Sequence, residues 1–165
     1  FSMRSFILMV GLIVTISHAA AQHTQEDKAV VDVVRLLFKG MLQGDSAIVR
    51  AAFEDDVTMA TAQRDLKGNP VLVRETSLDG VLKAVGTPHP DPWSEEIWDI
   101  KVERDGDFAQ VWCSYAFYRG NTFSHCGVDA FHLYRGKKGW RIFHLTDTRR
   151  KDGCQIPEEI QRKHQ

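Results

Sequence analysis

Between residues 24 and 86, hydrophobic residues recur every three or four positions in three segments. This spacing predicts three amphipathic helices. The first helix begins near Thr24, a capping residue, and ends at Gly44. Asp45 can cap the second helix. The third helix begins at Ser77 and ends at Gly86. Their hydrophobic positions are, in chain order, Val30, Val34, Leu37, Phe38 and Met41, then Ile48, Val49, Ala52 and Phe53, then Leu78, Val81, Leu82 and Val85.

Strand-like alternation is brief before residue 90 and sustained after it. Two short strands are expected at Val57–Thr61 and Val71–Val73, on either side of a turn at residues 68–70. From Glu95 the period of hydrophobic residues changes to two, and three turns, at residues 105–106, 119–121 and 136–139, divide the remainder. Four long strands in an antiparallel meander follow from this pattern. The helices come before most of the strands along the chain, and this order is typical of an α+β fold.

The segment Phe108–Tyr118 is apolar on both of its faces. One face would carry Val111, Cys113, Tyr115 and Phe117, and the other Trp112, Ala116 and Tyr118. An antiparallel sheet with one face in water shows a clean alternation instead. Three helices can cover one face, and we expect a second copy of the chain to cover the other, as a homodimer.

The first 21 residues differ in kind from the rest. A lone Arg4 precedes an apolar run over residues 6–16, and small residues at 19–21 come just before Gln22. This is the pattern of a secretory signal peptide, and the run is shorter than the roughly 20 residues of a membrane-spanning helix. We therefore expect a signal peptide at 1–21, a domain at 22–165, and a periplasmic or secreted protein without a membrane segment; an uncleaved N-terminal anchor is the alternative.

Charge and motifs exclude several classes of function. The 21 basic and 22 acidic residues give a net charge of −1, which argues against a nucleic-acid binder despite the basic run at residues 149–151. The sequence contains no nucleophile elbow, no glycine-rich phosphate loop and no His-Glu-x-x-His pattern, so hydrolases, nucleotide enzymes and zinc peptidases are not expected. No cofactor is expected. His132 and His144 could begin a metal site, but no third ligand follows at useful spacing, so no metal is expected either.

Export would expose Cys113, Cys126 and Cys154 to oxidation. An odd number leaves at least one thiol outside any internal pair. The turn at residues 119–121 places Cys126 opposite Ser114 or Tyr115, and the continuation of the last strand should pass Cys126 near Arg149. A Cys126–Cys154 disulfide is therefore favoured over Cys113–Cys126.

Over nearly all of residues 22–165 the chain resembles a known group of proteins. The residues that carry the resemblance are Trp112-x-x-Tyr115-x-Phe117-Tyr118, residues 123–131, Gly139-Trp140-Arg141-Ile142, and residues 147–154. They are similar to the nuclear transport factor 2-like superfamily, which includes SnoaL-like cyclases and the bacterial proteins labelled putative lumazine-binding. The resemblance implies a cone-shaped fold with three N-terminal helices packed on a curved antiparallel sheet. It implies no single activity, because this fold hosts isomerases, dehydratases, cyclases and binders.

Asp129 is the carboxylate of greatest interest, because it lies among apolar residues in a strand within the sheet. A carboxyl group in a dry interior has a raised pKa and can act as a general acid or base. It could instead pair with a basic neighbour, or lie at a dimer interface, and a bulge at Gly127 would change its face. His125 has the same parity but stands roughly 13 Å away at about 3.3 Å per residue. Across the hairpin His125 should face Tyr115 or Ala116, so Asp129, His125 and Tyr115 form the candidate catalytic set.

Aromatic residues supply candidate ligand contacts, although core packing is their ordinary role. The candidates are Trp98, Trp112, Tyr118 and His144. We expect a cone that holds a small, partly aromatic molecule, with two alternatives: an isomerase, dehydratase or cyclase that uses Asp129, or a protein-interaction domain that uses the sheet face. Whether Asp129 and His125 face a cavity separates these hypotheses.

Overall fold

The computed structural model describes residues 24–165, so the expected signal peptide lies outside the described residues. The chain is helical over residues 24–43, which we call the first helix. The remaining elements are α2 (Ser46–Ala52), β1 (Phe53–Arg64), β2 (Pro70–Glu75), α3 (Asp79–Gly86), β3 (Trp93–Asp105), β4 (Phe108–Arg119), β5 (Thr122–Gly136), β6 (Gly139–Thr148) and α4 (Glu158–Lys163). Within residues 24–165 no helix is both long and apolar enough to span a membrane.

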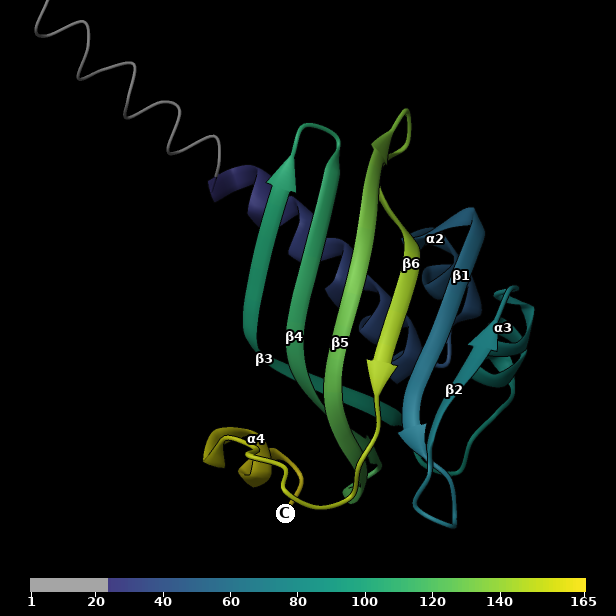
Figure 1. Cartoon of the computed structure of the whole chain (residues 1–165), viewed down its shortest axis with the longest axis vertical. Helices are drawn as coiled ribbons and strands as arrows, with labels where there is room; N and C mark the ends of the chain where they lie inside the picture. Colours follow the sequence, from purple (N-terminus) through teal and green to yellow (C-terminus); the bar gives the residue numbers. More distant parts are fainter. Residues whose placement is uncertain (1–23) are drawn as a thin grey trace, which may run out of the picture.

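The strands form one curved, six-stranded sheet in the order β2-β1-β6-β5-β4-β3 (Figure 1). The four-stranded meander of β3 to β6 is antiparallel, as the alternation predicts. The β1–β2 hairpin extends it, because β1 pairs in parallel with β6. The two expected short strands are therefore longer than the local pattern indicates and belong to the same sheet.

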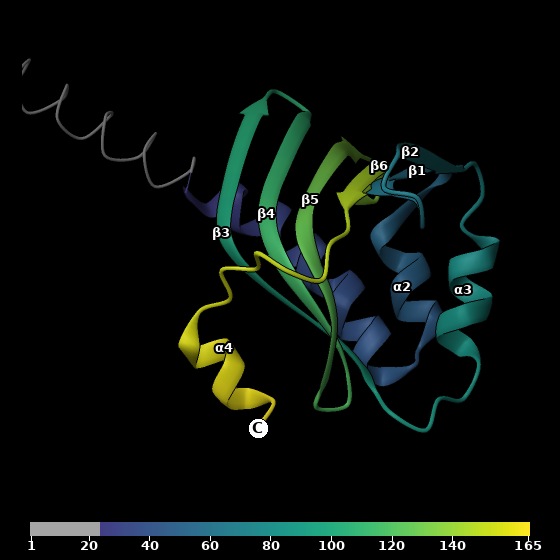
Figure 2. The ribbon, with the colours of Figure 1, turned by 60° about the horizontal axis from the view of Figure 1, so that its bottom comes forward.

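The first helix, α2 and α3 lie on one side of the sheet, and α4 lies on the other (Figure 2). The first helix turns Val30, Val34 and Leu37 toward the concave face, and each is at most 3% exposed. Phe38 contacts Phe131 of β5 edge-on, with 6.1 Å between ring centroids. The helical spacing of these residues is thus explained by burial against the sheet. The capping prediction for α2 is also confirmed, since the Asp45 carboxylate accepts from the backbone N–H groups of Ala47 and Ile48.

A bulge in β3 divides this strand into two segments of opposite parity. Asp99 has a φ of 52°, and the pairing with β4 shifts between Trp98 and Lys101. Aspartate tolerates this left-handed conformation better than most residues. As a result Ile97 packs in the concave core together with Val102, whereas Trp98 packs on the other side of the sheet. Trp98, Ile100 and Val102 alternate with charged residues in the sequence, which predicts Trp98 on the face of Val102. This prediction is wrong because of the inserted residue.

The β4–β5 hairpin also differs from the expected register. His125 pairs with Phe117, Cys126 with Ala116, and the register shifts between Phe117 and Tyr118. The expected partners of His125 were Tyr115 or Ala116, so the prediction was wrong by one or two positions. The irregularity lies next to the turn, where local sequence carries little information on register.

A disulfide joins Cys126 to Cys154, the pairing that the sequence favours, and the buried Cys113 is free. Just after β6, Cys126 and Arg150 form an isolated antiparallel bridge. The chain then continues into α4, whose Ile160 packs with Ala116 and Tyr118 on the convex side of the sheet. The disulfide and this small cluster hold the C-terminal segment against the sheet.

Candidate active site

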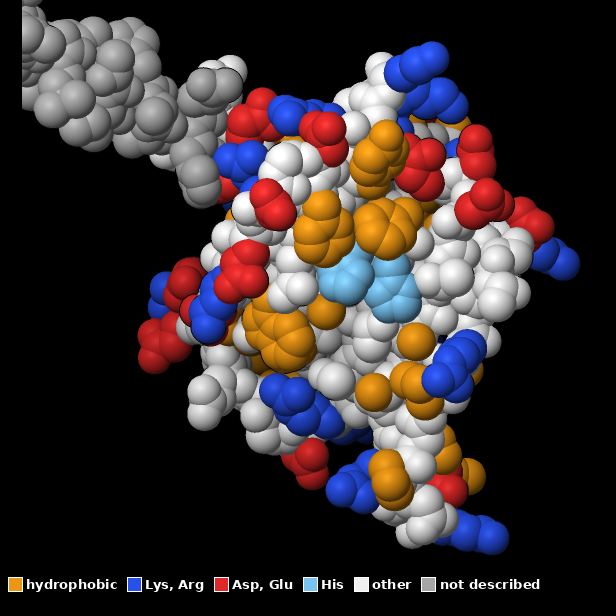
Figure 3. All heavy atoms as spheres, turned by 45° about the horizontal axis from the view of Figure 1, so that its top comes forward, with side chains coloured by type: hydrophobic (Ala, Val, Ile, Leu, Met, Phe, Trp, Pro, Cys, Tyr) orange, Lys and Arg blue, Asp and Glu red, His pale blue; other side chains and the backbone are white. Residues whose placement is uncertain are grey.

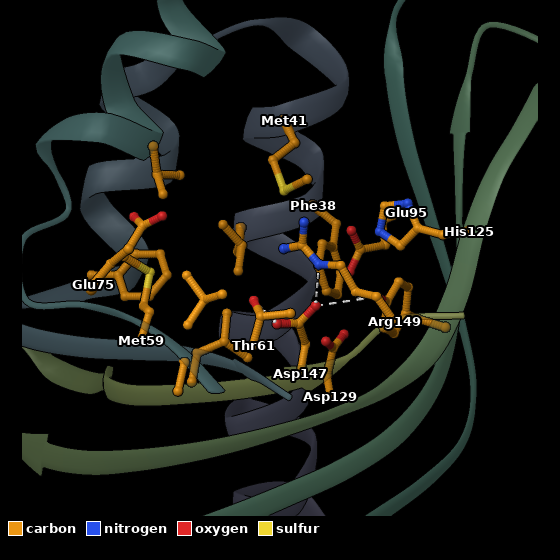
Figure 4. A pocket seen from close by; sticks show the side chains of 17 residues that line it. Phe38, Met41, Met59, Thr61, Glu75, Glu95, His125, Asp129, Asp147 and Arg149 are labelled. Atoms are coloured by element: carbon orange, nitrogen blue, oxygen red, sulfur yellow. Dashed lines mark hydrogen bonds and ion pairs between the residues drawn. The ribbon is translucent and has the colours of Figure 1, made fainter. Parts of the chain in front are cut away.

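A pocket opens between the first helix and the concave face of the sheet (Figure 4), with a volume of about 170 Å³. One side of it is apolar apart from Glu75 of β2, and the other carries polar side chains. The apolar residues come from the first helix, β1, β2, α3 and β6: Leu37, Phe38, Met41, Phe53, Met59, Val73, Val81 and Leu145. The polar residues on the other side are Thr61, Glu95, Tyr115, His125, Asp129, Asp147 and Arg149.

Two carboxyl groups share a hydrogen bond on the polar side. The side chains of Glu95 on β3 and Asp129 on β5 are hydrogen-bonded to each other. Asp129 is 3% exposed, and its Oδ2 has no hydrogen-bond partner among the described residues. Burial raises the pKa of Glu95 to about 7, and burial followed by repulsion from Glu95 raises the pKa of Asp129 well above its usual range. Near neutral pH the pair therefore holds at least one proton, which the two carboxyl groups share.

Asp147 of β6 organises the neighbouring polar residues. Its Oδ2 accepts from Arg149 Nε at 2.7 Å and from the Tyr115 hydroxyl at 3.3 Å, and its Oδ1 accepts from Thr61 Oγ1 at 2.6 Å (Figure 4). The Tyr115 hydroxyl also donates to the Thr148 carbonyl at 2.9 Å. Burial, followed by the nearby carboxylates, raises the pKa of Tyr115, so this phenol stays protonated. Asp147 is thus held as a paired carboxylate.

Gly127 allows Tyr115 to take this position. The two residues are partners across β4 and β5. A Cβ at position 127 would lie 1.8 Å from the Thr148 carbonyl oxygen and 2.8 Å from Tyr115 Cε1. Absence of a side chain therefore lets the tyrosine ring and the end of β6 approach the backbone of β5. His125 and Asp129, two positions before and after Gly127, both line the pocket, so Gly127 does not reverse their shared face.

His125 lies on the same wall and packs edge-on against Tyr115, with 5.7 Å between ring centroids. Its Nδ1 is 3.0 Å from Ser124 Oγ. Burial, followed by repulsion from Arg149, lowers the pKa of His125 to about 4. The imidazole is consequently neutral at physiological pH.

The three candidate catalytic residues, Asp129, His125 and Tyr115, thus lie together on one pocket wall. The four candidate ligand contacts do not line this pocket. Trp112 is 46% exposed on the convex face, and Trp98 and Tyr118 pack beneath the C-terminal segment, where Tyr118 stacks on His164 with 3.7 Å between centroids. His144 is hydrogen-bonded to Thr58 and Thr146 on the convex side. On each strand these four residues have the opposite parity to the pocket residues, so their side chains point to the convex face and not into the pocket.

Sequence reasoning did not assign roles to Glu95, Asp147 or Arg149. The bulge at Asp99 turns Glu95 inward, and no local pattern indicates that bulge. Asp147 and Arg149 share parity at the end of the last strand, a signal that could have placed them on one face. Within residues 24–165 no group of three or more His, Cys, Asp or Glu side chains is arranged to hold a metal ion.

Comparison with known proteins gives a family and a fold. Residues 25–145 match the model of a family described as putative lumazine-binding. No curated protein matches the sequence.

Three solved structures are similar over most of this chain. An NTF2-like protein of unknown function from Shewanella baltica is 20% identical, with 78% of this chain and 97% of that chain covered and a TM-score of 0.60. An NTF2-like protein with a cystatin-like fold from Novosphingobium aromaticivorans is 16% identical, with coverages of 86% and 93% and a TM-score of 0.63. A putative dehydratase of the NTF2-like family from Streptomyces avermitilis is 14% identical, with coverages of 77% and 97% and a TM-score of 0.58. The predicted nuclear transport factor 2-like fold is confirmed.

Proposed function

This chain belongs to the putative lumazine-binding family, and we propose that it binds a small, partly aromatic molecule in the pocket on the concave face of its sheet. One observation carries the proposal: an apolar pocket has the buried Oδ2 of Asp129 on its wall, without a partner among the described residues. An unsatisfied buried polar atom costs about 1–3 kcal/mol, which a ligand with a matching polar group would recover. A cavity of about 170 Å³ holds on the order of ten water molecules, the size of a one- or two-ring compound.

Two-dimensional NMR with 2-naphthamide, a two-ring amide, tests this proposal. We expect titration to shift the resonances of Tyr115, Leu145 and Thr61, while those of the exposed Trp112 stay unchanged. Asp129→Leu should weaken binding, because it replaces the polar wall atom by a methyl group of similar size. The reverse pattern, with shifts confined to the convex face around Trp112, would contradict the proposal.

Acid–base catalysis on the bound molecule is the second candidate, and the raised pKa values of the Glu95–Asp129 pair favour it. A carboxyl group with a pKa of about 7 gives up and takes back a proton readily at neutral pH. Tyr115 lies on the same wall, but its one hydroxyl hydrogen is held by the Thr148 carbonyl and Asp147 and would have to be released before it could be donated to a bound molecule. An isomerase-, dehydratase- or cyclase-type reaction would therefore use the Glu95–Asp129 pair as its proton carrier.

Exchange of the α-hydrogens of 2-tetralone in deuterated buffer tests this candidate. We expect the wild type to accelerate exchange beyond the buffer rate, and Glu95→Gln and Asp129→Asn each to remove most of the acceleration. Glu103→Gln, an exposed change on the same strand, is the matched control. Equal exchange rates with and without the wild type would rule out this activity for the probe and leave binding as the function.

A homodimer through the convex face remains our proposal for the assembly. Phe108, Trp112 and Tyr134 are 42–50% exposed there. Phe108 and Phe143 contact each other and His132, which lies against His144. Figure 3 shows hydrophobic side chains gathered around two histidines on this face. An exposed aromatic group of this extent is typical of an interface. We expect a dimeric mass in sedimentation velocity at micromolar concentration, and a monomeric mass for Trp112→Glu but not for Leu72→Glu, an equally exposed change on β2. A monomeric wild type would contradict the proposal.

The third hypothesis, a protein-interaction domain, has less support, because Asp129 and His125 face a pocket rather than the exposed face of the sheet. Export also remains a proposal. A disulfide between Cys126 and Cys154 is compatible with an oxidising compartment, which supports a periplasmic or secreted location.

A further inference from the structure

A second hollow lies at the mouth of the pocket. It has a volume of about 810 Å³ and shares His125 and Arg149 with the pocket. The ends of the β1–β2 hairpin form one side of it, and the segment that follows β6 forms the other. We call it the mouth groove. A molecule that extends past His125 and Arg149 would reach from the pocket into this groove.

The mouth groove is strongly basic. Its charged lining residues are Arg64, Arg149, Arg150 and Lys151, with Asp152 as the one carboxylate among them. Arg149 is paired with Asp147, and Arg64 donates to the Gly68 carbonyl at 2.6 Å. The side chains of Arg150 and Lys151 are exposed and form no ion pair with any residue between 24 and 165. Two positive charges are therefore available to an incoming anion.

The basic segment is fixed in place from both ends. Arg150 exchanges two backbone hydrogen bonds with Cys126, each 2.9 Å long. Four residues further along, the Cys126–Cys154 disulfide attaches the same segment to the same point of β5. Residues 150–154 thus form a closed loop on β5 directly beside His125. Such anchoring lowers the entropy lost when the loop orders around a ligand.

Charge is divided between the two ends of the combined cavity. The inner wall carries the Glu95–Asp129 pair, which holds a proton near neutral pH and repels a second anion when it ionises. The mouth groove carries the cations. A ligand with an apolar body and one anionic group would therefore bind with the body inward and the anion outward.

Resting on the proposed function, we infer that the natural ligand is a small aromatic acid, whose carboxylate or phosphate binds to Arg150 and Lys151 in the mouth groove. The pocket supplies affinity for the rings, and the groove selects the anion. Arg150 and Lys151 are then specificity-determining residues. Neither has a part in the interior proton chemistry, so their substitution should change ligand preference alone.

Calorimetry with three probes of one ring system tests the inference: 2-naphthoate, 2-naphthyl phosphate and the neutral 2-naphthamide. We expect the wild type to bind both anions more tightly than the amide at low salt, with a preference that shrinks at high salt. Arg150→Glu/Lys151→Glu should weaken anion binding roughly tenfold at low salt and leave amide binding within about twofold. The ratio between naphthoate and naphthyl phosphate separates a carboxylate ligand from a phosphate ligand.

A matched control is available at the other end of the sheet. Lys137→Glu/Lys138→Glu makes the same change of net charge in the exposed β5–β6 turn, far from the mouth groove (Figure 1). This variant should keep the preference for anions. Amide binding without anion preference in the wild type, or equal loss of preference in both double variants, would overturn the inference while the proposed function stands. Failure of all three probes to bind would overturn both.

Discussion

Replacing Glu95 by glutamine should change how stability depends on pH. The carboxyl group of Glu95 ionises at about 4.5 in an unfolded chain and at about 7 in the folded pocket. Between these values the folded state keeps a proton that the unfolded state has released. The free energy of unfolding therefore falls as pH rises through this window, and the contribution of the group is fully present only below pH 4.5.

The size of the effect follows from the shift. A rise of the Glu95 pKa from 4.5 to about 7 corresponds to about 3 kcal/mol. The Glu95–Asp129 pair shares its proton, so this is the upper bound for Glu95 alone. Glutamine keeps the shape and can donate to Asp129, but it cannot ionise. Relative to the wild type, Glu95→Gln should therefore gain about 2–3 kcal/mol between pH 5 and pH 8.

Urea unfolding of the wild type and of Glu95→Gln at a series of pH values measures this difference. Glu103→Gln, on the exposed face of the same strand, should show a constant difference from the wild type. The reasoning is refuted if the free energies of unfolding of the wild type and of Glu95→Gln differ by the same amount, to within about 0.5 kcal/mol, at every pH. Such a result would mean that water reaches the pair and that its pKa values are ordinary.

Three further changes test the site and its supports. NMR titration should find the pKa of His125 near 4, below the value of 6.5 in an unfolded chain. The residue should therefore reduce the free energy of unfolding as pH falls from 6.5 toward 4, and a pKa at or above 6.5 would contradict its burial. Gly127→Ala should destabilise the fold by about 3 kcal/mol or more in thermal unfolding, because its Cβ would overlap the Thr148 carbonyl, and a neutral effect would contradict the close approach. Cys154→Ser should cost about 3–4 kcal/mol, as expected for a cross-link across 28 residues, and a reductant should destabilise the wild type but not this variant.

Much of the fold could be predicted because its elements are specified locally. The helical spacing of Val30, Val34 and Leu37 follows from one buried face, and the capping role of Asp45 needs only its own helix. The hairpins likewise follow from turns between alternating segments. The parallel pairing of β1 with β6 joins segments more than 80 residues apart, and no local pattern records it.

The candidate site was predicted only in part, for reasons of strand parity. Asp129 and His125 have the same parity on β5, so alternation placed them on one face, but whether Tyr115 or Ala116 joins them depends on the register of the β4–β5 hairpin, which the sequence left open. Trp98 lies beyond the bulge at Asp99, and parity counted from Val102 therefore placed it on the wrong face. The same error hid Glu95, which a regular strand would have turned away from the pocket.

The bulge at Asp99 consequently has a functional meaning as well as a structural one. Without the inserted residue, the register with β4 would place Trp98 opposite Tyr115 and Glu96 opposite Phe117. The indole of Trp98 would then take the place of Ile97 in the concave core, and Glu95 would turn to the convex face. The irregular strand thus decides which side chains of β3 enter the pocket, while the regular strands beside it supply Tyr115 and His125. Conversion of Asp99 to a β-branched residue, which resists positive φ, should therefore disturb the pocket more than its exposed position suggests. We expect Asp99→Val to lower the affinity for 2-naphthamide, whereas Asp99→Gly should retain it.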